Sequence, residues 1–126
     1  MKFTHPEKIK NIETRGIRVT VILSTERSDG KLTILENEVG IGAASPMHSC
    51  KGEDKVILVN EGKFLFNANG EQYLAEKGCN IHIPNNTMYS FENIGTVTGK
   101  LLITLTPKVN ETFSKDVNQS IVVRCP

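Results

Sequence analysis

Several side chains that can hold a metal ion or move a proton lie close together in the stretch PMHSCKGEDKV. His48, Cys50 and Glu53 belong to residue types that bind zinc, so they form the candidate ligand set if the protein holds a metal. Lys55 disfavours the binding of a metal ion, because an ammonium group repels a cation. Tyr89 becomes a good ligand only after losing a proton with a reference pKa near ~10. We therefore predict no metal and no other cofactor, with Cys50 either a pocket residue or a small apolar filler.

The same residues are also suited to acid/base or anion-binding chemistry. His48 can act as a general base and Tyr89 as the acid that completes the pair, while Lys55 can stabilise an enolate or bind an anion. Each has a structural alternative: His48 as a hydrogen-bond donor at a rim, Tyr89 as wall packing, and Lys55 as a surface cation. In the free protein we expect Lys55 to reach solvent or to pair with Glu53 or Asp54.

Two groups of residues have the spacing of a known pair of motifs. The first group consists of Gly42, His48, Cys50, Lys55 and Gly62. The second group consists of Gly78, Pro84, Asn86, Tyr89 and Asn93. Their spacing resembles the two motifs of the cupin superfamily, in particular its small single-domain members with a conserved β-barrel. The resemblance covers roughly residues 31–113 and identifies the fold more specifically than the activity, because one scaffold can host many chemistries.

The resemblance implies a small jelly-roll barrel with a ligand site inside one open end. Family metal ions are usually held there by three histidines and a glutamate. On the matching positions of this sequence, His48 keeps its identity, whereas Cys50, Lys55 and Tyr89 replace a histidine, the glutamate and the last histidine. The motif is therefore degenerate as a metal site.

The elements that position these residues are predicted by short β-rich runs with turn residues between them. The predicted strands cover residues 18–25, 31–39, 56–59, 63–67, 71–75, 80–84, 89–92 and 100–106. Asn69-Gly70 is the residue pair best suited to a type I′ hairpin turn. Only residues 109–118 are compatible with a helix, and that helix would be short. We predict an all-β fold, an antiparallel jelly-roll β-barrel, with at most one short C-terminal helix.

The length predicts a single domain, residues 1–126, since one modest core is what such a chain can bury. Within it, residues 16–30 form an N-terminal hairpin strand, residues 31–113 the barrel core, and residues 114–126 a C-terminal extension. His82 has the opposite strand parity to Ile81 and Ile83, so we expect it to point away from the core.

Three hypotheses for function follow, in order of preference. In the first, the barrel binds a small molecule, anionic or partly polar, in a pocket that joins an apolar wall to polar groups. The predicted ligand-binding residues are His48, Cys50, Lys55, Ile57, Val59, Tyr89, Phe91 and Ile103. The second is a metal-free isomerase or epimerase with His48 and Tyr89 as catalytic residues. Family enzymes of that kind carry substrate-binding arginines, whereas all arginines here lie outside the motifs: Arg15, Arg18, Arg27 and Arg124. The third is a metal-dependent dioxygenase or isomerase.

Composition limits the partners. The 15 basic and 14 acidic side chains nearly cancel, so neither nucleic acid nor an acidic membrane is expected to bind. No apolar run suggests a signal peptide or a membrane span, and we predict a cytoplasmic protein. An odd number of cysteines in such a chain favours free thiols at Cys50, Cys79 and Cys125 over a disulfide framework. We expect a homodimer, because the late β-rich run at residues 120–124 can add to a sheet of its own or of a partner.

Overall fold

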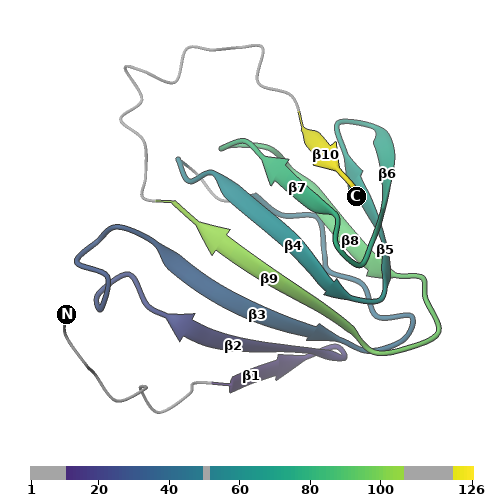
Figure 1. Ribbon diagram of the computed structural model, residues 1–126, viewed down its shortest axis with the longest axis horizontal. Helices are drawn as coiled ribbons and strands as arrows, with labels where there is room; N and C mark the ends of the chain where they lie inside the picture. Colours follow the sequence, from purple (N-terminus) through teal and green to yellow (C-terminus); the bar gives the residue numbers. More distant parts are fainter. Residues whose placement is uncertain (1–10, 50–51, 107–120) are drawn as a thin grey trace.

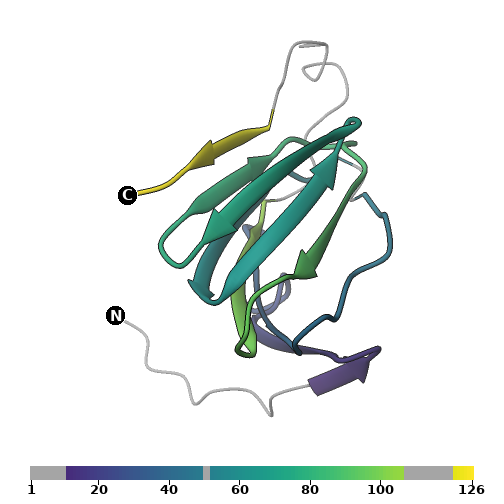
Figure 2. The same cartoon turned by 90° about the vertical axis from the view of Figure 1, so that its right-hand side faces the viewer.

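The protein is built from two antiparallel β-sheets that face each other (Figures 1 and 2). The computed structural model describes residues 11–49, 52–106 and 121–126. Within these ranges there is no helix, so the prediction of an all-β fold is confirmed. The short helix predicted at residues 109–118 lies outside the described residues. The division into a barrel core and two extensions stays a prediction.

In both sheets the order of the strands differs from their order in the chain. The larger sheet runs β1-β2-β3-β9-β4-β7-β10, with bounds Asn11–Thr14, Ile17–Leu23, Thr33–Val39, Gly99–Leu105, Lys55–Glu61, Asn80–Ile83 and Val122–Arg124. The smaller sheet runs β6-β5-β8, with bounds Glu71–Glu76, Lys63–Ala68 and Tyr89–Asn93. Every strand predicted from the sequence is present with shifted ends. Because β9 lies between β3 and β4, distant parts of the chain meet on one wall (Figure 1).

The first strand, β1, was missed by the sequence prediction. It joins β2 through a turn at Arg15 and Gly16, whose φ angles are 52° and 80°. Two positive φ angles are what a type I′ hairpin turn requires. The predicted turn at Asn69 and Gly70 has the same character, with φ of 53° and 76°, and it joins β5 to β6 as expected.

The core is formed by alternate residues of strands from both sheets. Ile57 and Val59 of β4 are buried on the same side of the larger sheet as Leu101 of β9. On the smaller sheet, the rings of Phe64 and Phe66 have centroids 6.3 Å apart. Every second residue is buried along β4, β5, β7, β8 and β9. This alternation, with the apolar side chains inside, is the pattern that holds two facing sheets together.

A disulfide between Cys79 and Cys125 corrects one prediction. The bond joins residues 46 positions apart and holds β10 at the edge of the sheet beside β7. The prediction of free thiols at these two positions is therefore wrong, because the C-terminal strand returns to the residue that precedes β7. Cys50 lies outside the described residues. Disulfides persist mainly in oxidising compartments, so a cytoplasmic location stays a prediction.

The late β-rich run pairs within its own chain. Val122 to Arg124 form β10, which is antiparallel to β7 through pairs such as Val123 with Ile81. Of the two alternatives for this run, the structure has the chain's own sheet. The prediction of a homodimer stays a prediction. No described helix has the length and apolar character needed to cross a membrane.

Candidate functional site

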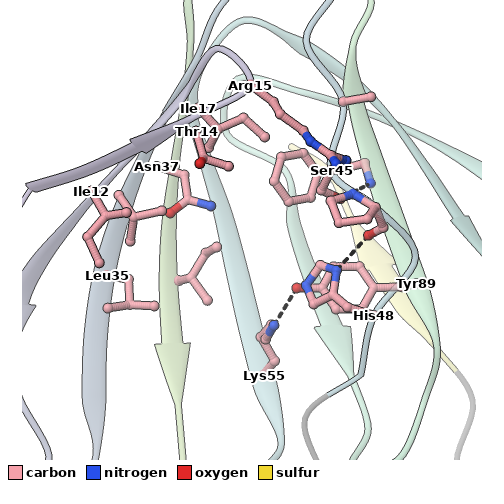
Figure 3. A pocket seen from close by; sticks show the side chains of 15 residues that line it. Ile12, Thr14, Arg15, Ile17, Leu35, Asn37, Ser45, His48, Lys55 and Tyr89 are labelled. Carbon is pink, nitrogen blue, oxygen red and sulfur yellow. Dashed lines mark hydrogen bonds between the residues drawn. The ribbon is translucent and has the colours of Figure 1, made fainter.

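A pocket of about 370 Å³ opens between the β1–β2 hairpin and the segment at residues 44–48 (Figure 3). Its inner wall is formed by side chains of β3, β4, β8 and β9. The large apolar lining residues are Ile12, Ile17, Val19, Leu35, Phe91 and Ile103. The polar or charged ones are Thr14, Arg15, Asn37, Ser45, His48, Lys55 and Tyr89. This volume lies within the range of small-molecule sites, and an apolar wall with a few polar groups is typical of them.

The segment that carries His48 is fixed by backbone bonding along β8. His48 N–H donates to the Tyr89 carbonyl oxygen at 2.9 Å, and Tyr89 N–H donates back to His48 at the same distance. Further along, Ser45 N–H donates to the Phe91 carbonyl at 2.8 Å, and the Ser45 hydroxyl accepts from Phe91 N–H at 3.0 Å. The segment thus extends the smaller sheet, which positions the histidine beside the first residue of β8.

Lys55 projects from the start of β4 into the pocket. Its side chain is buried, and its ammonium group donates a hydrogen bond to the Tyr89 hydroxyl (Figure 3). The same nitrogen lies 4.5 Å from the centroid of the Tyr89 ring, which is a cation–π distance. The prediction that Lys55 would reach solvent or pair with Glu53 or Asp54 is therefore wrong. Lys55 shares the inward face of β4 with Ile57 and Val59, so its side chain is directed toward the pocket and not toward the outer surface.

A hydrogen bond to the backbone defines which ring nitrogen of His48 carries the proton. Its Nδ1 lies 2.8 Å from the Pro46 carbonyl oxygen, and since a carbonyl only accepts, Nδ1 carries the proton. The Nε2 of the neutral ring is then a free base. Burial lowers the pKa of His48 below 6.5, and the positive charge of Lys55 lowers it further, although the bond to Pro46 raises it. The His48 and Tyr89 rings are in contact, with centroids 4.4 Å apart and an interplanar angle of 49°.

The lowered pKa of His48 makes stability depend on pH. Between the folded-state pKa of His48 and 6.5, the unfolded chain binds more protons than the folded protein does. The free energy of unfolding therefore rises with pH in this window and falls on acidification. We expect the loss between pH 7.5 and pH 5 to be smaller in His48→Gln than in wild type. Urea unfolding at several pH values measures it. Parallel pH profiles for the two proteins would contradict the prediction.

The structure brings some predicted residues together and leaves others apart. Phe91 and Ile103 line the pocket with His48, Lys55 and Tyr89. In contrast, Ile57 and Val59 are fully buried in the core between the sheets and are not among the lining residues. Lys55, Ile57 and Val59 face the same side of β4, as the alternation of a strand predicts, but only Lys55 of the three lines the pocket. Nothing is described of Cys50, the remaining predicted ligand-binding residue.

Among the lining residues that were not predicted are two with polar side chains of interest, Arg15 and Asn37. Arg15 belongs to the β1–β2 turn, and its side chain extends across the mouth toward Ser45 (Figure 3). The Arg-Gly pair could have suggested a turn, but nothing in the motifs places that turn over the pocket. Asn37 lies on the same face of β3 as Leu35 and Val39, and a polar residue at an inward position was a signal that could have been used.

The residues present do not fit a family metal ion. The described residues contain no group of three or more His, Cys, Asp or Glu side chains that could hold one. Glu53, the carboxylate of the candidate set with His48 and Cys50, lines a separate cavity with Thr25 and Leu105. At the matched positions the Lys55 ammonium bonds to the Tyr89 hydroxyl, and an ammonium nitrogen has no lone pair for a metal.

His82 lies outside the pocket, as its strand parity predicted. Its neighbours Ile81 and Ile83 are buried, while its Nε2 lies 3.3 Å from Oδ2 of Asp54. Asp54 Oδ1 also accepts from the backbone N–H of Asn85 at 2.9 Å. Burial raises the pKa of Asp54, but the hydrogen bonds from Asn85 and His82 outweigh it, so the net pKa is lowered. This carboxylate is therefore engaged on the outer surface, away from Lys55.

Comparison with known proteins identifies the family. The family model described as "Cupin domain" matches residues 36–105, which is more than half of the chain. The protein belongs to the cupin family. The antiparallel jelly roll expected from the motif spacing is thereby confirmed. The matching of His48, Lys55 and Tyr89 to individual motif positions stays a prediction.

Known proteins are similar to this chain to different extents. Quercetin 2,3-dioxygenase of Bacillus subtilis (strain 168) is 35% identical over 77 residues, which are 60% of this chain and 23% of that protein. The chain thus spans about a quarter of the length of this curated relative. A predicted oxalate decarboxylase from Thermotoga maritima superposes with a TM-score of 0.73 at 18% identity, covering 84% of this cupin and 99% of that chain. The cupin domain of Schizosaccharomyces pombe Cnp3 gives 0.72 at 17% identity, covering 89% and 78%. The two structures support the fold alone.

Proposed function

We propose that this cupin binds a small carboxylate or similar anion with an apolar body in the pocket beside Lys55. The supporting observation is the charge of the lining. Among the described lining residues are two cationic side chains, Lys55 inside and Arg15 at the mouth, and no Asp or Glu. An apolar wall of low polarisability strengthens the attraction of such cations for an anion.

The arrangement of the cations favours an ordered ligand. The Lys55 ammonium is fixed by its bond to the Tyr89 hydroxyl and by its position over that ring. An anionic group beside it would also meet the Tyr89 hydroxyl and the His48 ring, whose centroid is 4.4 Å from that of Tyr89. The apolar part of the ligand then packs on Phe91, Ile103 and their neighbours. Charge-assisted hydrogen bonds set the orientation, and apolar contact supplies area.

The test uses 3-phenylpropanoate and its neutral amide, which share one apolar body. Calorimetry on the wild-type protein should give a dissociation constant on the order of 0.1–1 mM for the carboxylate, as expected for a ligand of this size. The amide should bind about tenfold more weakly, since it loses one charge-assisted interaction. Equal affinity would exclude the anion preference. Absence of binding of either compound at about 10 mM would exclude the proposed ligand class.

A second candidate is metal-free acid/base catalysis, favoured by the tautomer of His48. The bond from Nδ1 to Pro46 leaves Nε2 as a base, and the Lys55–Tyr89 pair could stabilise an oxyanion formed beside it. Proton exchange at the carbon next to the carbonyl of a 2-oxo acid, followed by NMR in D₂O, tests this activity. Exchange above the buffer rate that disappears in His48→Gln would support it, and the buffer rate alone would exclude it.

Metal-dependent oxidation remains the third candidate. It is suggested by the dioxygenase named as the Bacillus subtilis relative, of which the chain matches only 23%. The donor set described above does not fit that chemistry, because the motif spacing matches Lys55 and Tyr89 to two of the family's ligand positions. We therefore place it below binding and below metal-free catalysis.

A further inference from the structure

Asn37 is a buried polar residue of the pocket wall that the proposed function does not yet use. It lies on β3 between Leu35 and Val39 and is 7% exposed. Its neighbours across the sheet are Val19 of β2 and Leu101 of β9, both apolar. The Oδ1 atom of Asn37 is buried and accepts no hydrogen bond from the described residues. An amide in such surroundings favours a polar group supplied from the pocket.

The strand register places Asn37 far from Lys55 along the same wall. Lys55 pairs with Leu105 of β9, and Leu105 pairs with Thr33 of β3, four residues before Asn37. Four residues along a strand and two strand spacings across give a Cα separation of about 16 Å. Ile103 and Leu35 pair with each other on the rungs between them, and both line the pocket. The wall therefore has two polar positions with an apolar span between them (Figure 3).

We propose that Asn37 binds a hydroxyl group of the ligand, so that the preferred ligand class is a hydroxylated carboxylate with an apolar middle. The inference rests on the proposed function, because the Lys55 end must hold the anionic group. A hydroxyl suits this position because it can donate to Oδ1 and also accept from the amide N–H groups of Asn37. A second carboxylate would suit it less, since the unpartnered Oδ1 is itself an acceptor.

The experiment compares 3-(4-hydroxyphenyl)propanoate with 3-phenylpropanoate by calorimetry. These compounds share the carboxylate and the apolar body and differ in the terminal hydroxyl. Wild type should bind the hydroxylated compound about tenfold more tightly, the contribution of one well-placed hydrogen bond. The Asn37→Leu variant should bind both compounds with equal affinity, and its affinity for 3-phenylpropanoate should remain measurable. Since the variant replaces a buried amide by an apolar side chain of similar size, its melting temperature should not fall.

A control variant separates Asn37 from general effects of losing an amide. Asn67→Leu makes the same change on β5, at a residue outside this pocket, and should keep the tenfold preference. Equal affinity of wild type for the two compounds would overturn the inference while leaving the proposed function intact. A preference that survives in Asn37→Leu would also overturn it. If wild type binds neither compound, the proposed function fails and the inference fails with it.

Discussion

Lys55→Met is expected to weaken binding of 3-phenylpropanoate at least about tenfold while changing the affinity for the neutral amide by less than about twofold. Methionine keeps the unbranched stem of lysine and much of its volume, so the apolar contacts remain. What is lost is the ammonium group that bonds to Tyr89 and faces the pocket. One charge-assisted interaction accounts for a loss of this size. Calorimetry with both compounds measures it.

Lys63→Met is the matched control for this prediction. Lys63 lies at the start of β5, where its side chain is 46% exposed and its Nζ is 3.9 Å from Glu76. It is not among the residues that line the pocket. The control should therefore bind both compounds as wild type does. A similar loss in Lys63→Met would mean that net charge, and not the pocket lysine, determines affinity; no loss in Lys55→Met would contradict the proposed role.

Local patterns were sufficient for most of the fold. The alternation of Ile81, His82 and Ile83 gave the correct faces of β7, because the side-chain period of a strand is fixed by its geometry. Asn69 and Gly70 gave the correct hairpin turn, because few residue pairs accept two positive φ angles. The spacing of the motifs also gave the correct barrel, because each gap places a residue at a particular register in neighbouring strands.

The site depended on contacts that local patterns do not contain. Spacing placed the Lys55 backbone at the pocket, but the position of its head group follows from its contact with Tyr89, which belongs to the other sheet. Arg15 was missed for the same reason. The turn at Arg15 meets the pocket only because β1 and β2 add to the edge beside β3. Residues near in sequence were thus predicted better than those brought together by strand order.

The prediction for the cysteines failed for a different reason: it rested on their number and not on where the strands place them. Pairing was rejected because the number of cysteines is odd and no export signal was seen. An odd number excludes only the pairing of every cysteine, and Cys79 and Cys125 are paired in the structure. Their proximity follows from β10, which runs beside β7 and ends next to the residue that precedes it.

Removing this disulfide is expected to lower the free energy of unfolding by about 4 kcal/mol. The bond closes a loop of 46 residues, and the chain entropy that such a loop removes from the unfolded state has this magnitude. The double variant Cys79→Ser/Cys125→Ser should therefore unfold at a lower urea concentration than wild type. Denaturation curves followed by circular dichroism give the midpoints and slopes from which the free energies are obtained.

A reducing agent provides the control, because it breaks the same disulfide bond while both cysteines stay in the chain. It should shift the wild-type midpoint to that of the double variant and leave the double variant unchanged. Binding of 3-phenylpropanoate should change by less than about twofold, because β10 and the β1–β2 hairpin lie at opposite edges of the larger sheet (Figure 1). Equal midpoints for wild type and double variant without reductant would show that the bond contributes no stability. A large loss of binding would instead mean that β10 positions the pocket through β7 and β4, the strand that carries Lys55.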